Sequence, residues 1–134
     1  MGSAIDRVDY FDSSALVKRY LLEAGSNWVQ AHYHDATCFI AIADVGRVEI
    51  AAAFAGKLRG GLISPVEYQA VRMMLDTDVH RRYYIIPVEK QRIDEAIVLT
   101  GRRKLRGYDA VHLACALYLN QTLLDNRLPP LVFV

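Results

Sequence analysis

Apolar and polar residues follow two different periods along this chain, and the alternation of the two predicts strands alternating with helices. Short apolar runs at residues 8–11, 37–43, 83–88 and 131–134 have the length and composition of strands. The run at 37–43 is continuous rather than alternating, which is typical of a strand buried on both faces of a parallel sheet. Four strands are therefore expected.

The segments between these runs carry apolar residues at helical spacing. Ser64-Pro65-Val66-Glu67 combines an N-cap, a proline at the first helical position and a glutamate at the capping-box position, so it predicts a helix start. Asp44 is expected to cap the helix after the second strand. Helices are predicted at residues 15–21, around 28–29, from 44, over 64–82, over 89–99 and from 109.

This order of elements predicts the fold class. Strands that alternate with helices indicate a three-layer α/β/α sandwich around a parallel sheet of about four strands. The length of 134 residues suits a single domain over 1–134, since domains average roughly 150 residues. In such folds the functional groups gather at the carboxyl ends of the strands, where the strand order reverses.

Composition and charge exclude several classes of protein. A hydrophobic content of 53% excludes global disorder, and a net charge of +1 predicts no general attraction to nucleic acid or to a membrane surface. The longest stretch without Asp, Glu, Lys or Arg, residues 110–124, is too short and polar to span a bilayer. Cys38 and Cys115 lie in apolar runs and are expected to be buried and unpaired. Met1–Ala4 has no signal-peptide character, so a cytoplasmic location is expected.

Three acidic residues fall where the predicted strands meet the following helices. Asp12 ends the first strand, Glu49 lies among apolar residues in the helix after the second, and Asp109 starts the helix before the fourth. Helix capping alone would explain Asp12 or Asp109, whereas Glu49 needs a partner because a carboxylate among core residues is costly to bury. Carboxylates that converge repel one another, and oxygen ligands without a Cys or His cluster suit Mg²⁺ or Mn²⁺.

The segments that carry these acids resemble the motifs of a known family. Residues 10–18 (YFDSSALVK), 47–53 (RVEIAAA) and 105–114 (LRGYDAVHLA) resemble the three motifs of PIN domains, and the whole chain looks most like a VapC toxin of a type II toxin–antitoxin pair. The resemblance implies a Mg²⁺- or Mn²⁺-dependent endoribonuclease that is homodimeric and inhibited by a VapB-like antitoxin. Asp12, Glu49 and Asp109 would be the catalytic metal ligands, and Ser13 would hold a carboxylate or a metal-bound water.

The sequence departs from the family pattern at two points. Family members usually carry a further acidic residue after the fourth strand, then a helix and a fifth strand, whereas this sequence ends at Val134, so the fifth edge strand is expected to be missing. Asp125 is no substitute, because it precedes the fourth strand in a predicted turn. Asp44 stands where a Ser or Thr is usual, and is read as a helix cap or as a further carboxylate around the metal.

Basic residues give the chain two candidate contacts with RNA. Arg102, Arg103, Lys104 and Arg106 come immediately before Asp109, where they suit either a solvated helix end or contact with RNA phosphates. Lys18 follows the Asp12 loop and has a weaker claim of the same kind.

His112 follows Asp109 by three residues on the same side of the predicted helix. We expect a histidine that packs beside the site and either orients Asp109 or fills space, rather than a general base. A helical stripe over residues 68–75 offers one candidate face between two copies of the chain, formed by Tyr68, Val71, Met74 and Leu75.

Two other functions compete with the nuclease. A catalytically impaired PIN-like module would bind RNA or an antitoxin without cleaving, and the missing segment after the fourth strand favours it, whereas the intact acidic trio favours the enzyme. A phospho-accepting receiver domain is disfavoured, since it needs an Asp after the third strand, where this chain has Pro87-Val88-Glu89.

Overall fold

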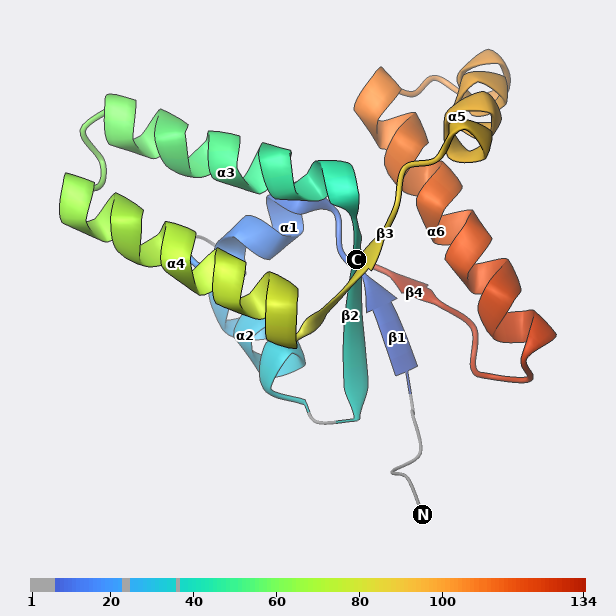
Figure 1. Cartoon of the computed structure of the whole chain (residues 1–134), viewed down its shortest axis with the longest axis horizontal. Helices are drawn as coiled ribbons and strands as arrows, with labels where there is room; N and C mark the ends of the chain where they lie inside the picture. Colours follow the sequence, from blue (N-terminus) through green and yellow to red (C-terminus); the bar gives the residue numbers. More distant parts are fainter. Residues whose placement is uncertain (1–6, 23–24, 36) are drawn as a thin grey trace.

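A four-stranded parallel sheet forms the centre of the computed structural model, which describes residues 7–22, 25–35 and 37–134 (Figure 1). The strands are β1 (Arg7–Tyr10), β2 (Cys38–Ala43), β3 (Tyr83–Ile86) and β4 (Val132–Phe133), in the order β3-β2-β1-β4. All three pairings are parallel, which confirms the predicted sheet. The expectation about Met1–Ala4 lies outside the described residues.

The helices connect these strands at the predicted places. They are α1 (Ser13–Leu16), the 3₁₀ helix η1 (Val17–Arg19), α2 (Ser26–His34), α3 (Asp44–Arg59), α4 (Pro65–Arg81), α5 (Lys90–Arg102) and α6 (Gly107–Asp125). The single helix predicted over 15–21 is wrong in detail, because the chain forms one short α-helical turn and then tightens into η1. Short 3₁₀ segments of this kind are common at helix ends.

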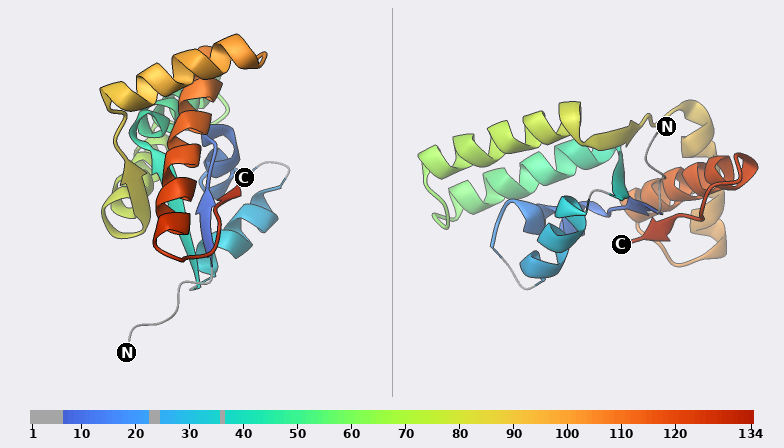
Figure 2. Two further views of the ribbon diagram at one scale, coloured as in Figure 1. Left: turned by 90° about the vertical axis from the view of Figure 1, so that its right-hand side faces the viewer. Right: turned by 90° about the horizontal axis from the view of Figure 1, so that it is seen from below.

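Helices cover both faces of the sheet and give the predicted three layers. Ile40 and Ile42 of β2 pack into a core with α1, α3 and α4, while Ala41 and Ala43 face α6 on the opposite side. Figure 2 shows α6 against one face and α1 to α4 against the other. Burial on both faces explains why the sequence of β2 is almost continuously apolar, although Phe39 near its start is exposed.

The strand order reverses at β1. The chain adds β2 and then β3 on one side of β1, and β4 pairs with its other side. The β1–β4 pairing continues beyond the strands, since the Val134 amide donates to the Tyr10 carbonyl (2.8 Å) and the Asp12 amide donates to the Val134 carbonyl (3.1 Å). Asp12, two residues after the end of β1, therefore lies at the switch point, where parallel sheets place their ligand sites.

Helix α4 begins with the predicted capping box. Ser64 Oγ accepts a hydrogen bond from the Glu67 amide, and the Glu67 carboxylate accepts one from the Ser64 amide. Val71 and Leu75 are buried in the core, so the predicted stripe on α4 is not free to form a face between two copies.

Both cysteines are buried and unpaired, as predicted. Burial raises the pKa of the Cys38 and Cys115 thiols to about 11, which keeps them protonated and unreactive at neutral pH. Within the part of the chain that the structure describes, no helix has both the length and the apolar character that crossing a membrane requires.

Candidate functional site

Asp12 stands at the carboxyl end of β1, where the backbone passes from the sheet into α1. It occupies the N-cap position of α1 with extended backbone angles (φ −62°, ψ 147°), but its side chain makes no capping hydrogen bond. The half-buried carboxylate instead accepts a hydrogen bond from Ser14 Oγ at 2.6 Å. Helix capping therefore does not account for this carboxylate.

Glu49 projects from α3 toward β1 and α6, and it has the partners that its apolar surroundings require. Its Oε1 accepts a hydrogen bond from Ser13 Oγ (2.8 Å) and lies 2.5 Å from Nε2 of His112. The side chain is 30% exposed, so one edge of the carboxylate reaches solvent. Oε2 makes no hydrogen bond or ion pair with any other described residue.

His112 is buried at the centre of this group, with a relative exposure of 2%. Its Nδ1 lies 2.6 Å from the Tyr10 hydroxyl, and its Nε2 lies 3.4 Å from Ser13 Oγ. The prediction of a packed histidine is confirmed. Of the two roles expected for it, orienting Asp109 is not supported, because His112 contacts Glu49 and no hydrogen bond joins it to Asp109 among the described residues.

Asp109 is exposed in the first turn of α6. The helix begins at Gly107, two residues before the predicted start, and its N-cap is Arg106, so Asp109 is not a cap. No hydrogen bond or ion pair joins its carboxylate to another described residue. A negative charge in the first turn is favourable to the helix dipole, which is one reason for an acid at this point.

Each of the three acids is linked to the Ser13–His112 pair by contact or by position in the chain. Asp12 is the neighbour of Ser13, Glu49 contacts both members of the pair, and Asp109 lies one helical turn before His112 on the same side of α6. Carboxylate oxygens are the type of ligand that a hard divalent cation prefers. Within the described residues, however, no three His, Cys, Asp or Glu side chains gather closely enough to hold an ion, so Asp12 and Asp109 would have to turn toward Glu49.

Gly46 and Tyr10 also lie beside residues of the candidate site, and the sequence did not identify either of them as part of it. A Cβ on Gly46 would lie 3.3 Å from Ser13 Oγ and 3.6 Å from Cε1 of His112, so only glycine leaves these side chains their present positions. A glycine inside a helical pattern is the sequence signal that would have indicated this close approach. The hydroxyl of Tyr10 gave no comparable signal.

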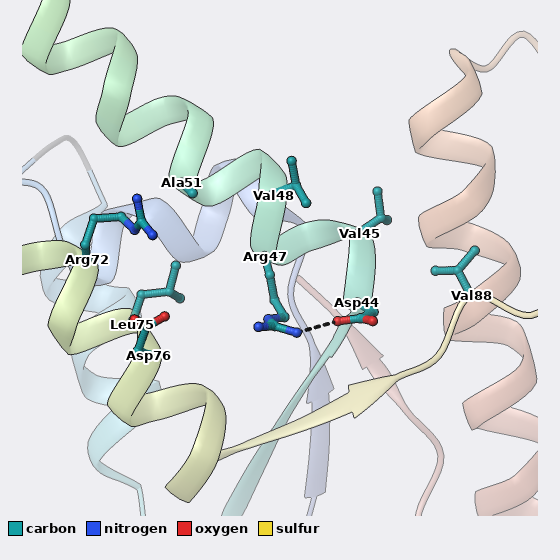
Figure 3. A pocket seen from close by; sticks show the side chains of 9 residues that line it. All are labelled: Asp44, Val45, Arg47, Val48, Ala51, Arg72, Leu75, Asp76 and Val88. Atoms are coloured by element: carbon teal, nitrogen blue, oxygen red, sulfur yellow. Dashed lines mark hydrogen bonds and ion pairs between the residues drawn. The ribbon is translucent and has the colours of Figure 1, made fainter.

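A cavity of about 650 Å³ opens between α3 and α4, away from these acids (Figure 3). Asp44 lies on its wall, where it pairs with Arg47 at 3.0 Å. The expectation that Asp44 caps α3 is wrong, because Ala43 is the N-cap and Asp44 is the first helical residue. None of Asp12, Glu49 and Asp109 lines this cavity.

The basic residues of the candidate RNA contact lie between α5 and α6. Arg102, Arg103, Lys104 and Arg106 are exposed, and none of them forms an ion pair with a described residue. Lys18 is on η1, where its side chain lies beside Gly25. Arg106, the last of the four clustered cations, comes three residues before Asp109.

Comparison with known proteins gives structural relatives but no match in sequence. No protein-family model matches this sequence, and neither does any curated protein. A chain of a solved structure, the "Toxin-antitoxin complex from Klebsiella pneumoniae", superimposes with a TM-score of 0.55 over 92% of this chain and 82% of that chain, at 20% sequence identity. At that identity the likeness establishes a shared fold.

Proposed function

We propose that this protein is a metal-dependent endoribonuclease that acts as the toxin of a toxin–antitoxin pair. The observation that carries the proposal is the contact of Glu49 with Ser13 and His112, with Asp12 next to Ser13 in the chain at the switch point of the sheet and Asp109 one helical turn before His112. The fold shared with a chain of the Klebsiella toxin–antitoxin complex supports the toxin–antitoxin part.

In this proposal the chain's own groups hold and orient the reactants. Glu49 is fixed by Ser13 and His112, while Asp12 and Asp109 contribute carboxylates from the neighbouring elements. Bound Mg²⁺ or Mn²⁺ would supply charge neutralisation at the scissile phosphate and a water of lowered pKa. The exposed cations at residues 102–106 would bind phosphates beside the cleavage point, which places the RNA backbone across the start of α6.

The proposed partner is a VapB-like antitoxin, and the proposed assembly is a homodimer. Support for a protein partner comes from the structural relative, whose printed description is that of a toxin–antitoxin complex. An inhibitor of this nuclease would have to block access to the exposed carboxylate of Asp109 and to the open edge of Glu49.

Cleavage of RNA by purified protein tests the proposal. With Mg²⁺ or Mn²⁺ present, Asp12→Asn, Glu49→Gln and Asp109→Asn should each reduce the cleavage rate by roughly 100-fold or more, since each removes a proposed metal ligand. Asp125→Asn is the matched control, because among the described residues Asp125 accepts a hydrogen bond from Gln121 alone, at the end of α6. If Asp12→Asn cleaves as fast as the parent protein, the proposed role of Asp12 is wrong.

A catalytically impaired PIN-like module is the second candidate. The observation that favours it is the lack of a ready-made metal cluster among the described residues. Calorimetric titration with Mn²⁺ separates the two functions: a nuclease should show a saturable site that Glu49→Gln weakens, whereas an impaired module should show no such site.

A further inference from the structure

A continuous line of hydrogen bonds runs from the interior of the sheet to the exposed edge of Glu49. The Tyr10 hydroxyl contacts Nδ1 of His112 (2.6 Å), and Nε2 of the same ring contacts Glu49 Oε1 (2.5 Å). Tyr10 is fully buried and His112 is 2% exposed, so water has little access to either contact. The two side chains come from β1 and α6, which lie on either side of this core.

The positions of the protons along this line follow from the groups themselves. Burial raises the pKa of Tyr10 far above its ordinary value, so the hydroxyl keeps its proton and donates it to the only acceptor that it has among the described residues, Nδ1 of His112. Nδ1 then carries no proton, and the ring proton that faces Glu49 is on Nε2. This N–H points at Glu49, which as a carboxylate only accepts.

We propose that Tyr10 and His112 are positioning residues that hold Glu49 as a metal ligand through one oxygen. Oε1 is occupied by the two donors, Ser13 Oγ and Nε2 of His112, so Oε2 is the oxygen left for a cation. This inference rests on the proposed metal-binding role of Glu49. It predicts monodentate rather than bidentate coordination by this residue.

The same contacts exclude a nucleophilic serine at this point. In a Ser-His-acid triad the two ring nitrogens serve different partners, one the serine and the other the acid. Here Nε2 faces both Ser13 and Glu49, and Nδ1 is used by Tyr10. Ser13 is also only 6% exposed and donates directly to the carboxylate. The geometry therefore suits orientation of Glu49 rather than attack by Ser13.

Nitrogen-15 NMR of the imidazole ring tests the proton arrangement without any metal. In the parent protein we expect the chemical shifts of an imidazole that is protonated on Nε2 and unprotonated on Nδ1. In Tyr10→Phe, which removes the hydroxyl and keeps the aromatic ring, we expect the shifts to move toward a mixture of tautomers. A parent protein with the proton on Nδ1 would overturn the inference.

Mn²⁺ affinity tests the positioning role. His112→Met keeps the length of the side chain but loses the donor, and it should weaken Mn²⁺ binding 10- to 100-fold, the usual effect of losing a group that orients a metal ligand. His112→Gln places an amide N–H near the position of Nε2 and should restore binding to within about threefold of the parent, since it keeps the donor. Equal losses in the two variants, measured alongside their unfolding free energies, would show a purely structural histidine and overturn the inference.

Failure of this inference is distinguishable from failure of the proposed function. If the parent protein binds no Mn²⁺ and cleaves no RNA, the proposed nuclease is wrong and the positioning of a metal ligand falls with it. If the parent binds and cleaves while Tyr10→Phe and His112→Met bind Mn²⁺ equally well, the nuclease stands and the positioning role is wrong.

Discussion

Single residues around Ser13 decide how firmly Glu49 is held. Ser13 donates to Glu49, and Gly46 on the facing side of α3 leaves just enough room for its hydroxyl. Glycine inside a helix costs about 1 kcal/mol relative to alanine. At Gly46 that cost coincides with a tight contact to the candidate site, whereas Gly56, ten residues further along the same helix, has open space around it.

Alanine at Gly56 and alanine at Gly46 should have different effects on stability and on Mn²⁺ binding. Gly56→Ala should raise the free energy of unfolding by up to about 1 kcal/mol and leave RNA cleavage and Mn²⁺ binding unchanged. Gly46→Ala should gain no stability and should weaken Mn²⁺ binding by roughly 10-fold, because its Cβ displaces Ser13 from Glu49. Urea unfolding and Mn²⁺ calorimetry on both variants provide the measurement. Equal stabilisation with unchanged binding at Gly46 would contradict this account of the contact.

The sequence singles out the acids of the candidate site but not the side chains that contact Glu49. Asp12, Glu49 and Asp109 follow from local pattern, because each falls beside a predicted strand end or helix start. The contact of Tyr10 with His112 joins residues 102 positions apart, and that of Glu49 with His112 spans 63. Such contacts depend on how β1, α3 and α6 pack, which local pattern does not contain.

At the scale of elements, a buried carboxylate joins α4 to its neighbours. Asp78 of α4 accepts hydrogen bonds from Tyr20 (2.6 Å) and Tyr33 (2.7 Å), and Arg19 Nε lies 3.6 Å from it. Tyr83 of β3 completes the group through its contact with the Tyr20 hydroxyl at 2.5 Å. One side chain thus connects α4 with η1, α2 and β3.

Removal of this carboxylate should destabilise the whole protein. Asp78→Ala removes the buried carboxylate that accepts from two tyrosine hydroxyls and pairs with Arg19, so we expect a loss of about 3–5 kcal/mol in the free energy of unfolding. Tyr33→Phe is the control, because it removes one hydroxyl and should cost only about 1 kcal/mol. Urea titrations followed by circular dichroism measure both. A loss at Asp78 no larger than that at Tyr33 would show that the cluster does not join these elements.

Element boundaries were predictable where side chains signal them locally. The Ser64-Glu67 box placed the start of α4 correctly, since both of its hydrogen bonds lie within four residues. The starts of α3 and α6 were each misplaced, because Ala43 and Arg106 occupy their N-cap positions without any side-chain cap. Where the backbone enters a helix directly from a buried strand or a loop, no capping side chain in the sequence indicates the first helical residue.

At the scale of the whole molecule, several buried groups ionise less readily in the folded state than in the unfolded chain. Burial raises the pKa of Cys38 and Cys115 to about 11 from an ordinary value of 9.0, and it raises that of Tyr10, Tyr20 and Tyr83 above the ordinary 10.0. In each case the folded state retains a proton that the unfolded chain gives up.

Stability should therefore fall at alkaline pH. Above pH 9 the unfolded chain binds fewer protons than the folded one, so the free energy of unfolding decreases with pH, by about 1.4 kcal/mol per pH unit for each such group. The decline should begin near pH 9 with the thiols and steepen above pH 10 with the tyrosines. Urea unfolding at pH 7.5, 9, 10 and 10.5 measures it, and Cys115→Ala should flatten the curve between pH 9 and 11. A stability that stays constant up to pH 10.5 would contradict the prediction.

The layered parallel sheet was predictable from the alternation of strands and helices, but the strand order was not. Whether a fourth strand pairs with β3 or returns to β1 depends on long connections over the sheet. Here β4 returns to β1, and the reversal places Asp12 at the switch point. The position of Asp12 therefore depends on the pairing of β4 with β1. With β4 beside β3, the same residues would not place Asp12 at a reversal of strand order.

The pairing of Asp12 with Val134 also ties the site to the order in which the chain is made. A ribosome releases Val134 more than a hundred residues after Asp12, so until then the carboxyl end of β1 lacks its neighbour on one side. Contacts between such distant residues form late in folding, because a long loop must close first. The candidate site proposed for this protein would thus be completed only after Val134 has emerged from the ribosome, because the neighbour of Asp12 on that side of the sheet is absent before then.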